Sequence, residues 1–434
     1  MSVIRRLVLV GLAVAVTSAP ARASSEAQGA RRDPSFGAGR GWVTTRIPGV
    51  ASVAYGAATV PGGGVVIAGQ ATTPAGAGQI LVVRYQPDGR LDRSFGSRGI
   101  FRTALPAADG PFIATSIVAQ RSTGRLLIAG GYGLGSMLVL RLTRAGRLDR
   151  TFGVKRTGIV TLSAGGIAQS LATQPGGGIL LGGSNANRNG RPMVVARFTA
   201  GGVLDRRFGR GGLAQALFWN PDLAASAGVI GLATAPNGGV IASGHLDYIG
   251  SDGHGSAGVF RLSSTGRPVR SFGSGGHVEV AFRQPSGTFA QWFPCAMTIG
   301  ARDLITVAGD GSAGAGAAIL SARLSPRGVL DPSYGRPGTG RVVTPGARSD
   351  SDTTCGATAS AAGGLTVGVG STVAQLRSDG TPDSRFARRG LITITQPRHV
   401  SINAVVRAGS RRIVVAGSAG DDVYLARYVV PAQP

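Results

Sequence analysis

Charge is scarce in this sequence, and lysine is almost absent from it. Of the 434 residues 15% are charged, and Lys155 is the one lysine among 45 basic residues. The 20 acidic residues leave a formal net charge of +25, which arginine carries almost alone. So few charges exclude a coiled coil and a charge-rich disordered chain, because both need many charged residues.

Long apolar runs are also lacking. The first covers residues 7–16, whereas a helix needs roughly 20 residues to span a bilayer. Arg5 and Arg6 precede this run, and Ala21-Arg22-Ala23 follows it as a small-x-small cleavage site. This order of features is typical of a secretory signal peptide. We therefore predict a signal peptide over residues 1–23, an exported protein that has lost three arginines of the +25 total, and no membrane span.

Glycine, in contrast, is abundant. The chain has 72 glycines, more than twice the usual share of ~7%. Hydrophobic residues still make up 43% of the chain, so there is enough apolar surface for a large core. Much glycine together with a full apolar complement predicts many short strands joined by tight turns.

One phrase, Leu-Asp-x-x-Phe-Gly-x-x-Gly, recurs through the chain at intervals of 52 to 64 residues. Its aromatic residue serves as an anchor for each copy. The seven anchors are Phe36, Phe95, Phe152, Phe208, Phe272, Tyr334 and Phe386. A repeat of this length, found before any residue-level motif, decides the fold class.

Each anchor is followed by the same four apolar segments, which in the first copy are residues 42–44, 57–63, 65–69 and 80–85. Four short strands with turn residues between them make one unit, and seven such units predict an all-β, seven-bladed β-propeller. We place the propeller over residues 32–430, after a short exposed segment at 24–31 and before a tail at 431–434. Residues 42–45 should pair with 423–430 and close the ring, which would remove exposed sheet edges.

The anchor has a structural interpretation. Gly after Phe permits a positive φ at the turn, and the aromatic ring offers an apolar wedge between blades. The Asp should pair with the Arg that ends the preceding strand: Arg84 with Asp92, Arg141 with Asp149, and Arg197 with Asp205. In the fifth copy we expect this pair to be missing, because Arg270 stands where the Asp is expected.

The Leu-Asp-x-x-Phe-Gly phrase, the Pro87-Asp88-Gly89 turn and the Val-Ala-Gly strand together resemble the bacterial delta-60 repeat. The resemblance covers about residues 32–430 and implies a β-propeller. Since that family is largely of unknown function, the resemblance implies no catalytic residues. The fourth to sixth copies depart most from the pattern, so a specialised site is expected there.

Long irregular insertions fall on one face of the predicted ring, in blades four and five. Loops on a rigid scaffold commonly carry function, and aromatic residues with amides suit a sugar- or peptide-binding groove. The alternative is that these aromatics only pack the loops onto the barrel. The candidate ligand-binding residues are Phe218, Trp219, Asn220, His245, Tyr248, Phe289, Gln291 and Trp292.

Other chemistry is weakly indicated. His245, Asp247, Asp252 and His254 are metal-ligand types, but their spacing fits neither a zinc site nor a calcium loop, so we expect no metal and no cofactor. The sequence contains no Gly-x-Ser-x-Gly and no His-Glu-x-x-His motif. Cys295 and Cys355 begin equivalent strands of neighbouring blades; in an exported protein such a pair favours a disulfide, with free buried thiols as the alternative.

These observations favour an exported, monomeric, non-catalytic binding module with a glycan or protein ligand on the loops of blades four and five. A glycan-acting hydrolase or lyase on the same scaffold is the first alternative. The second is electrostatic adhesion to anionic envelope polymers, driven by the net charge. We expect no specific nucleic-acid site, because no basic run with interleaved aromatics is present.

Overall fold

The computed structural model describes most of the chain after residue 28. The described residues are 29–103, 112–132, 135–163, 166–185, 192–216, 218, 227–235, 237–247, 255–283, 289–313, 316–335, 338–348, 355–360 and 363–431. The predicted signal peptide over residues 1–23, residues 24–28 of the predicted exposed segment and residues 432–434 of the tail lie outside them. No helix of the described part is long and apolar enough to cross a membrane.

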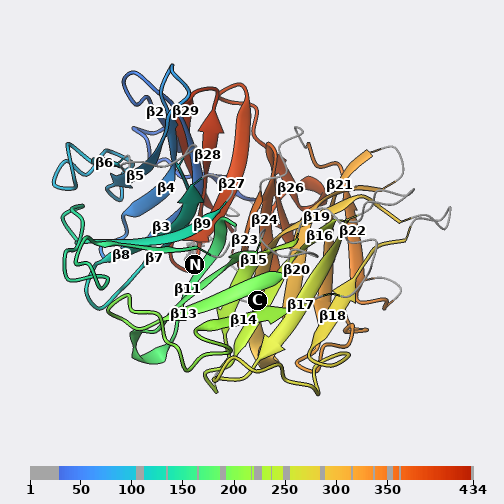
Figure 1. Cartoon of the computed structure of the whole chain (residues 1–434). Coiled ribbons are helices and arrows are strands. Elements are labelled where there is room, and N and C mark those ends of the chain that lie inside the picture. Colours follow the sequence, from blue (N-terminus) through green and yellow to red (C-terminus); the bar gives the residue numbers. More distant parts are fainter. Residues whose placement is uncertain are drawn as a thin grey trace, which may run out of the picture.

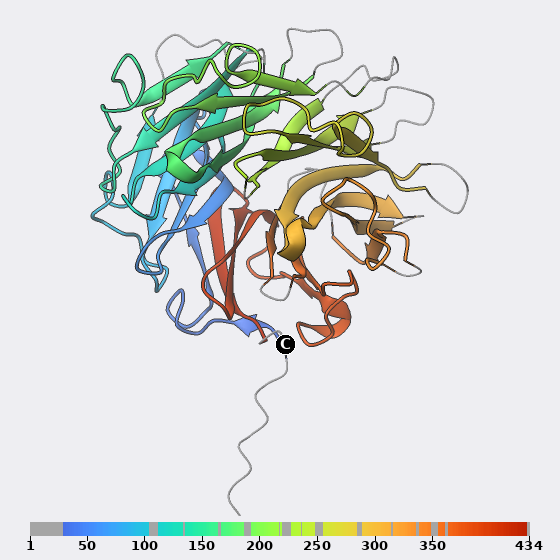
Figure 2. The same ribbon diagram turned by 90° about the horizontal axis from the view of Figure 1, so that it is seen from below.

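Seven antiparallel sheets form a ring (Figures 1 and 2). We number six blades in chain order and call the last one the closing blade. The first blade consists of β3 (Ala51–Thr59), β4 (Val65–Thr72), β5 (Gly78–Tyr85) and β6 (Ile100–Thr103), and the second of β7 (Phe112–Ala119), β8 (Leu126–Tyr132), β9 (Ser136–Leu142) and β10 (Ile159–Leu162). The third has β11 (Ala168–Thr173), β12 (Ile179–Ser184), β13 (Met193–Phe198) and β14 (Leu213–Ala216), and the fourth β15 (Ala227–Thr234), β16 (Val240–Asp247), β17 (Gly255–Leu262) and β18 (His277–Val280).

The remaining blades follow the same order. The fifth has β19 (Trp292–Ile299), β20 (Ile305–Ala313), β21 (Gly316–Leu324) and β22 (Arg341–Pro345), and the sixth β23 (Cys355–Ala359), β24 (Leu365–Val369), β25 (Thr372–Leu376) and β26 (Leu391–Thr393). The closing blade joins β27 (Val400–Arg407), β28 (Arg412–Ala419) and β29 (Asp422–Val429) to β1 (Arg31–Arg32) and β2 (Trp42–Thr45). Three single-turn 3-10 helices complete the described elements: η1 (Pro175–Gly177), η2 (Ala301–Asp303) and η3 (Arg388–Gly390). The predicted all-β, seven-bladed propeller is therefore confirmed.

The predicted ring closure is confirmed as well. Trp42 lies opposite Ala426 and Thr45 opposite Val423, so β2 is the outermost strand of a sheet whose other strands come from the far end of the chain. Figure 2 shows the first strands of the chain beside the last ones. The sequence repeat and the blade are thus out of phase by one strand, because the strand after each anchor completes the preceding blade. The strand β1 begins at Arg31, inside the segment predicted to be exposed.

The core lies between blades rather than within them. Among the described residues, seven clusters of buried apolar side chains each combine two neighbouring blades. Phe95 of the first blade, for example, is fully buried and packs with Phe112 and Leu126 of the second. The interpretation of the anchor ring as a wedge is therefore confirmed.

The anchor Asp and the preceding Arg form the predicted ion pairs. Arg141 Nε donates to Asp149 Oδ2 at 2.8 Å, and its Nη1 donates to Ala200 O of the third blade at 2.7 Å. The Arg141 guanidinium also lies 4.6 Å from the centre of the Phe152 ring. Each such arginine therefore joins its own anchor to the next blade, and pairs between Arg84 and Asp92 and between Arg197 and Asp205 follow the same pattern.

The fifth copy of the phrase requires a correction. Val269 N donates to Arg261 O at 2.9 Å, as Asp92 N donates to Arg84 O. The residue at the Asp position is therefore Val269 and not Arg270. The expected loss of the Asp is real, and the apolar Val269 packs against a buried cluster instead.

Candidate functional site

A cavity of about 740 Å³ occupies the central channel, lined by the innermost strand of every blade. In six of these strands the pairing with the second strand is interrupted by one extra residue, a β-bulge. A bulge re-aims the extra side chain and is common beside binding sites. The six extra residues all line the cavity: Tyr55, Thr115, Gln169, Ile230, Cys295 and Asn403.

The glycine that ends each Val-Ala-Gly strand explains the bulge. At Gly69 a Cβ atom would collide with the carbonyl oxygen of Val53 on the bulged strand. Only glycine lets the two backbones approach so closely. The repeat therefore fixes the backbone of the channel, whereas the extra residue itself differs in each of the six bulged blades.

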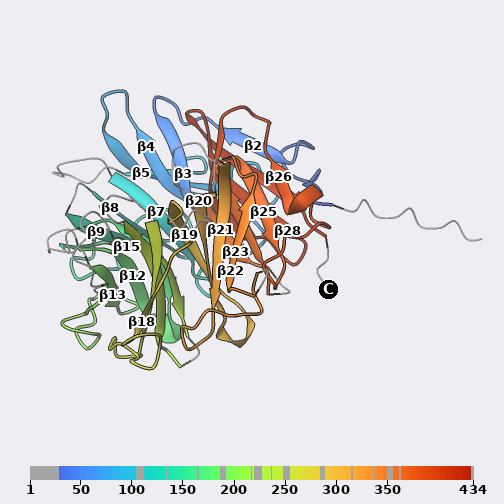
Figure 3. The same ribbon diagram turned by 90° about the vertical axis from the view of Figure 1, so that its right-hand side faces the viewer.

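Three of the bulged residues tie blades together. Thr115 Oγ1 donates to Ala168 O of the third blade at 2.6 Å, and Asn403 Nδ2 donates to Ala54 O of the first blade at 2.8 Å. Cys295 forms a disulfide with Cys355, their Cα atoms 5.6 Å apart. This bond links the fifth and sixth blades, which lie side by side (Figure 3).

Gln169 instead belongs to a polar corner of the channel that we call the channel corner, formed by Gln169, His245 and Asp247. Gln169 Oε1 is buried and accepts no hydrogen bond from the described part of the chain. A Cβ at Gly228 would collide with Gln169 Oε1 and would lie 3.2 Å from His245 Cε1, so the missing side chain at Gly228 lets both groups approach. An unpaired buried acceptor is costly, and a ligand donor would remove that cost.

The charges of the corner follow from burial. His245 Nε2 lies 4.0 Å from Asp247 Oδ2, and the two side chains are 21% and 30% exposed. Burial lowers the pKa of His245 below its usual 6.5, while the Asp247 carboxylate opposes this shift. His245 is therefore neutral at neutral pH.

The other predicted ligand residues do not join His245 in one groove. Trp292 is fully buried at the start of β19, where its ring meets Phe282 edge to face at 4.7 Å between ring centres. The expectation of an exposed stacking face is therefore wrong for Trp292, because its ring packs between blades. Its neighbour Phe293 lines the channel.

Phe218 lies elsewhere. Its ring meets the His277 ring edge to face at 5.0 Å and lines a separate cavity of about 390 Å³ with Ser274 and Glu279. Phe289 is half-buried, with the Arg283 guanidinium 4.5 Å from its ring centre, and the backbone oxygen of Gln291 accepts a hydrogen bond from Ser312 N at 3.0 Å. The predicted residues Trp219, Asn220 and Tyr248 lie outside the described residues.

The sequence reading missed Gln169. Its signal was the position directly before a small residue (Gly, Ala or Ser) in each of the six bulged inner strands, where Tyr, Thr, Gln, Ile, Cys and Asn replace one another. Within the described residues no three His, Cys, Asp or Glu side chains are placed to hold a metal ion. Among the described lining of the channel, Asp247 is the one carboxylate and His245 the one imidazole.

Comparison with known proteins gives a family model for a β-propeller domain of unknown function (DUF5122), which matches residues 63–95. No curated protein matches the chain. Among solved structures, the chain is similar to a polysaccharide lyase of family PL25, an ulvan lyase bound to -[GlcA(1-4)Rha3S]-, with 10% identity over 90% of this chain and 96% of that one and a TM-score of 0.47.

Two further structures are comparable. The polysaccharide lyase Uly1 has 8% identity over 87% of this chain and 90% of its own, with a TM-score of 0.49. The α-L-arabinofuranosidase Arb93A from Fusarium graminearum has 11% identity over 89% and 94%, with a TM-score of 0.43. A likeness of this degree says nothing about what the present chain binds.

Proposed function

We propose that this protein is an exported, non-catalytic binding propeller that takes the hydroxyl-bearing end of a ligand, such as a neutral saccharide, in the channel corner. The observation that carries the proposal is the buried, unpaired Oε1 of Gln169 beside His245 and Asp247. Its oxygen can only be satisfied by a donor from outside the described chain.

The chemistry of the corner favours hydroxyl groups. Gln169 Oε1 and the Asp247 carboxylate accept hydrogen bonds, and neutral His245 both donates and accepts one. Ile230, Leu232 and Met297 line the same cavity and offer apolar contact to the C–H faces of a sugar ring. A volume of about 740 Å³ lies in the range of small-ligand sites, roughly 300–1,000 Å³.

A binding role fits the corner better than catalysis does. Hydrolysis of a glycosidic bond commonly needs a pair of carboxylates, and Asp247 is the single carboxylate in the described lining. The Cys295–Cys355 disulfide supports export, since such bonds persist in oxidising compartments. We also propose that the protein acts as a monomer without a specific nucleic-acid ligand, and that its repeat is a delta-60 repeat.

The substitution Gln169→Leu tests the proposal, because it removes the acceptor and keeps the size of the side chain. We expect the affinity for a neutral oligosaccharide to fall roughly 3- to 10-fold. The free energy of unfolding should not fall, because a buried unpaired acceptor is removed with it. Gln215→Leu, on the outer strand β14, is the matched control and should leave the affinity unchanged.

The readout is tryptophan fluorescence during titration with a panel of neutral oligosaccharides, at low and at high salt, since Trp292 adjoins the channel residue Phe293. A saturable response that survives high salt and weakens only in Gln169→Leu supports the proposal. No saturable response from any panel member, or equal affinities of the two variants, overturns it. Shortened oligosaccharides in the same samples would overturn its non-catalytic part.

A further inference from the structure

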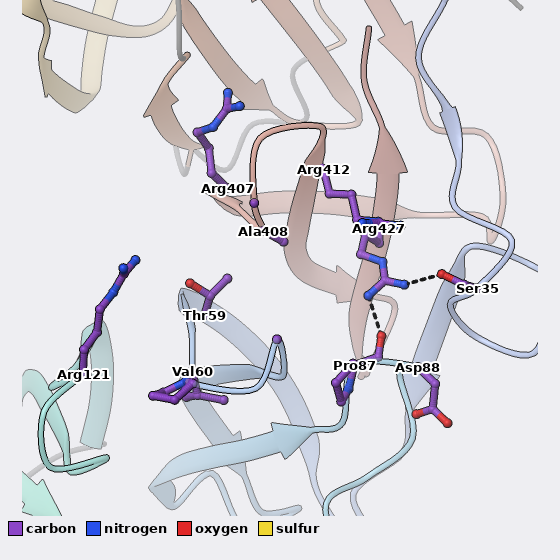
Figure 4. Close-up of a pocket in the computed structure, with 13 residues that line it drawn as sticks. Ser35, Thr59, Val60, Pro87, Asp88, Arg121, Arg407, Ala408, Arg412 and Arg427 are labelled. Carbon is purple, nitrogen blue, oxygen red and sulfur yellow. Dashed lines mark hydrogen bonds between the residues drawn. The ribbon is translucent and has the colours of Figure 1, made fainter. Parts of the chain in front are cut away.

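A second cavity, of about 1040 Å³, lies at the seam where the closing blade meets the first blade. We call it the seam pocket. Its lining comes from the β3–β4 turn, the Pro87-Asp88 turn, the β7–β8 turn of the second blade, the β27–β28 turn with the strand ends beside it, Ser35 of the first anchor turn and Arg427 of β29. Figure 4 shows Arg121 on one side of the pocket and Arg412 and Arg427 on the other, with Thr59 and Val60 between them.

Positive charge dominates this pocket. Arg121, Arg407, Arg412 and Arg427 line it, and Asp88 is the one carboxylate among its described lining residues. The buried Asp33 lies behind Arg412 and Arg427 and accepts a hydrogen bond from the Nε atom of each at 2.8 Å. Four guanidinium groups against two carboxylates leave the pocket clearly cationic.

Two of the arginines have a structural role. Arg427 belongs to the series of anchor arginines: besides Asp33 it contacts Ser35 Oγ at 2.8 Å and the carbonyl oxygen of Pro87 on the first blade. Arg412 shares Asp33 with it, as Arg125 shares Asp149 with Arg141 in the second blade. These two groups hold the seam together, as their equivalents do at another blade.

Arg121 and Arg407 have no counterpart in that series. The turn hydrogen bonds of Ala408 N to Arg412 O and of Val60 N to Gly64 O align Arg407 with Thr59. The same alignment places Arg121 with Pro61, so neither position carries an arginine in the first blade. Arg121 is exposed and forms no ion pair with a described carboxylate, and Arg407 donates only to the nearby Ser410 O within the described contacts. The repeat therefore does not explain these two cations.

We infer that the seam pocket binds a ligand that carries two or more anionic groups, carboxylate, sulfate or phosphate. Guanidinium groups bind such oxyanions strongly. Because the four arginines come from separate segments of the protein, they suit a ligand whose anionic groups are spaced along its length. None of the described lining residues is aromatic, so the pocket has no platform for stacked bases, which single-stranded nucleic acids use. Thr59 adds a hydroxyl group between the cations (Figure 4). This site is independent of the channel corner.

The test measures the affinity for two probes, tetragalacturonate and inorganic tripolyphosphate, by calorimetry at physiological ionic strength. Arg121→Gln/Arg407→Gln removes the two unexplained cations, and Arg206→Gln/Arg207→Gln removes two exposed arginines from the fourth anchor turn as a matched control. Charge-assisted hydrogen bonds are the strong ones, so losing two of them should weaken the affinity of the first double variant roughly 100-fold, and the control should change less than about twofold. Unchanged thermal unfolding of both variants shows that the fold is kept.

A one-to-one complex with tetragalacturonate alone assigns the pocket to carboxylate-bearing chains, and with tripolyphosphate alone to phosphate-bearing ones. Either result supports the inference if the loss is confined to Arg121→Gln/Arg407→Gln. Equal losses in both double variants would show unspecific attraction to the net charge and overturn it. Absence of saturable binding of either probe to the unchanged protein would also overturn it.

Discussion

The channel corner and the seam pocket are built on the same repeat but have opposite chemistry. The corner is lined by groups that accept hydrogen bonds and is partly buried, with one carboxylate among its described residues. The pocket is lined by four cationic donors. The comparison shows that the repeats fix the backbone of both sites, while a few unrepeated side chains decide what each can bind.

The two sites also use different backbone features. In the channel the variable position is the extra residue of a β-bulge, whose backbone depends on a repeated glycine such as Gly69. At the seam the variable positions lie on or directly beside the turns between the first two strands of a blade: Arg121 on the β7–β8 turn and Arg407 at the end of β27. Both positions are free to change because neither takes part in the Arg–Asp pairs that join neighbouring blades.

The largest effect on stability is expected at the seam, from Asp33→Ala. This change removes the partner of the structural arginines Arg412 and Arg427 and leaves Arg121 and Arg407 untouched. Asp33 is 2% exposed, and its loss leaves Arg427 buried without its partner, which should lower the free energy of unfolding by roughly 3–5 kcal/mol. Denaturant unfolding measures this. Asp88→Ala, in the same pocket but half-exposed, is the control and should change it by less than about 0.5 kcal/mol; equal effects would show that Asp33 does not close the ring.

The same carboxylate sets an acid limit for the seam. Burial alone would raise the pKa of Asp33, but hydrogen bonds from Ser35 and the nearby Arg412 and Arg427 outweigh it and lower this pKa to about 2. The stabilisation is therefore complete above a pH of about 4 and is lost as the pH falls towards 2. Asp33→Ala should lack this part of the acid unfolding curve.

An intermediate effect on stability is expected from the Cys295–Cys355 disulfide in the channel wall. Cys295→Ser/Cys355→Ser removes the disulfide and should lower the free energy of unfolding by about 2–4 kcal/mol. A reducing agent should lower the free energy of unfolding of the unchanged protein by the same amount and should not change that of the double variant. If the double variant still binds a neutral saccharide, the disulfide only supports the ring and is not part of the channel corner. If binding is lost, the disulfide belongs to the ligand site.

The smallest effect is expected from the pH response of the corner. Since burial lowers the pKa of His245 in the folded protein, the unfolded chain takes up the proton first as the pH falls below about 6.5. The free energy of unfolding should therefore decrease over that range. His245→Gln should flatten this decrease, whereas His399→Gln at an exposed position should not; a decrease that persists in His245→Gln would point to another group.

Much of the fold could be predicted because the same pattern of strands and turns occurs seven times in the sequence. The pairs of Arg141 with Asp149 and of β2 with β29 follow from spacing alone. Trp292 misled the prediction, because its place beside a long insertion suggested exposure, whereas it begins the inner strand β19 and is buried between blades. Whether a loop aromatic faces solvent depends on packing that a single sequence does not reveal.

The two sites themselves were harder to find. His245 was identified from its residue type, but Gln169 lies in β11 of the preceding blade and approaches it only because of the bulge and the small Gly228. Arg121 and Arg407 are far apart in the chain, and ring closure alone brings their turns together. In both sites, the missing information was a contact between distant copies of the repeat.

The seam has a mechanical consequence. Arg31 lies directly opposite Val429, so the chain enters and leaves the closing sheet at the same point. A pulling force applied before β1 and after β29 would break the hydrogen bonds between these two strands one after another, in unzipping geometry. It would not load all of these bonds at once, as shear would. The ring would therefore resist tension poorly when held at both of these points, and a tether attached at only one of them would leave the seam unloaded.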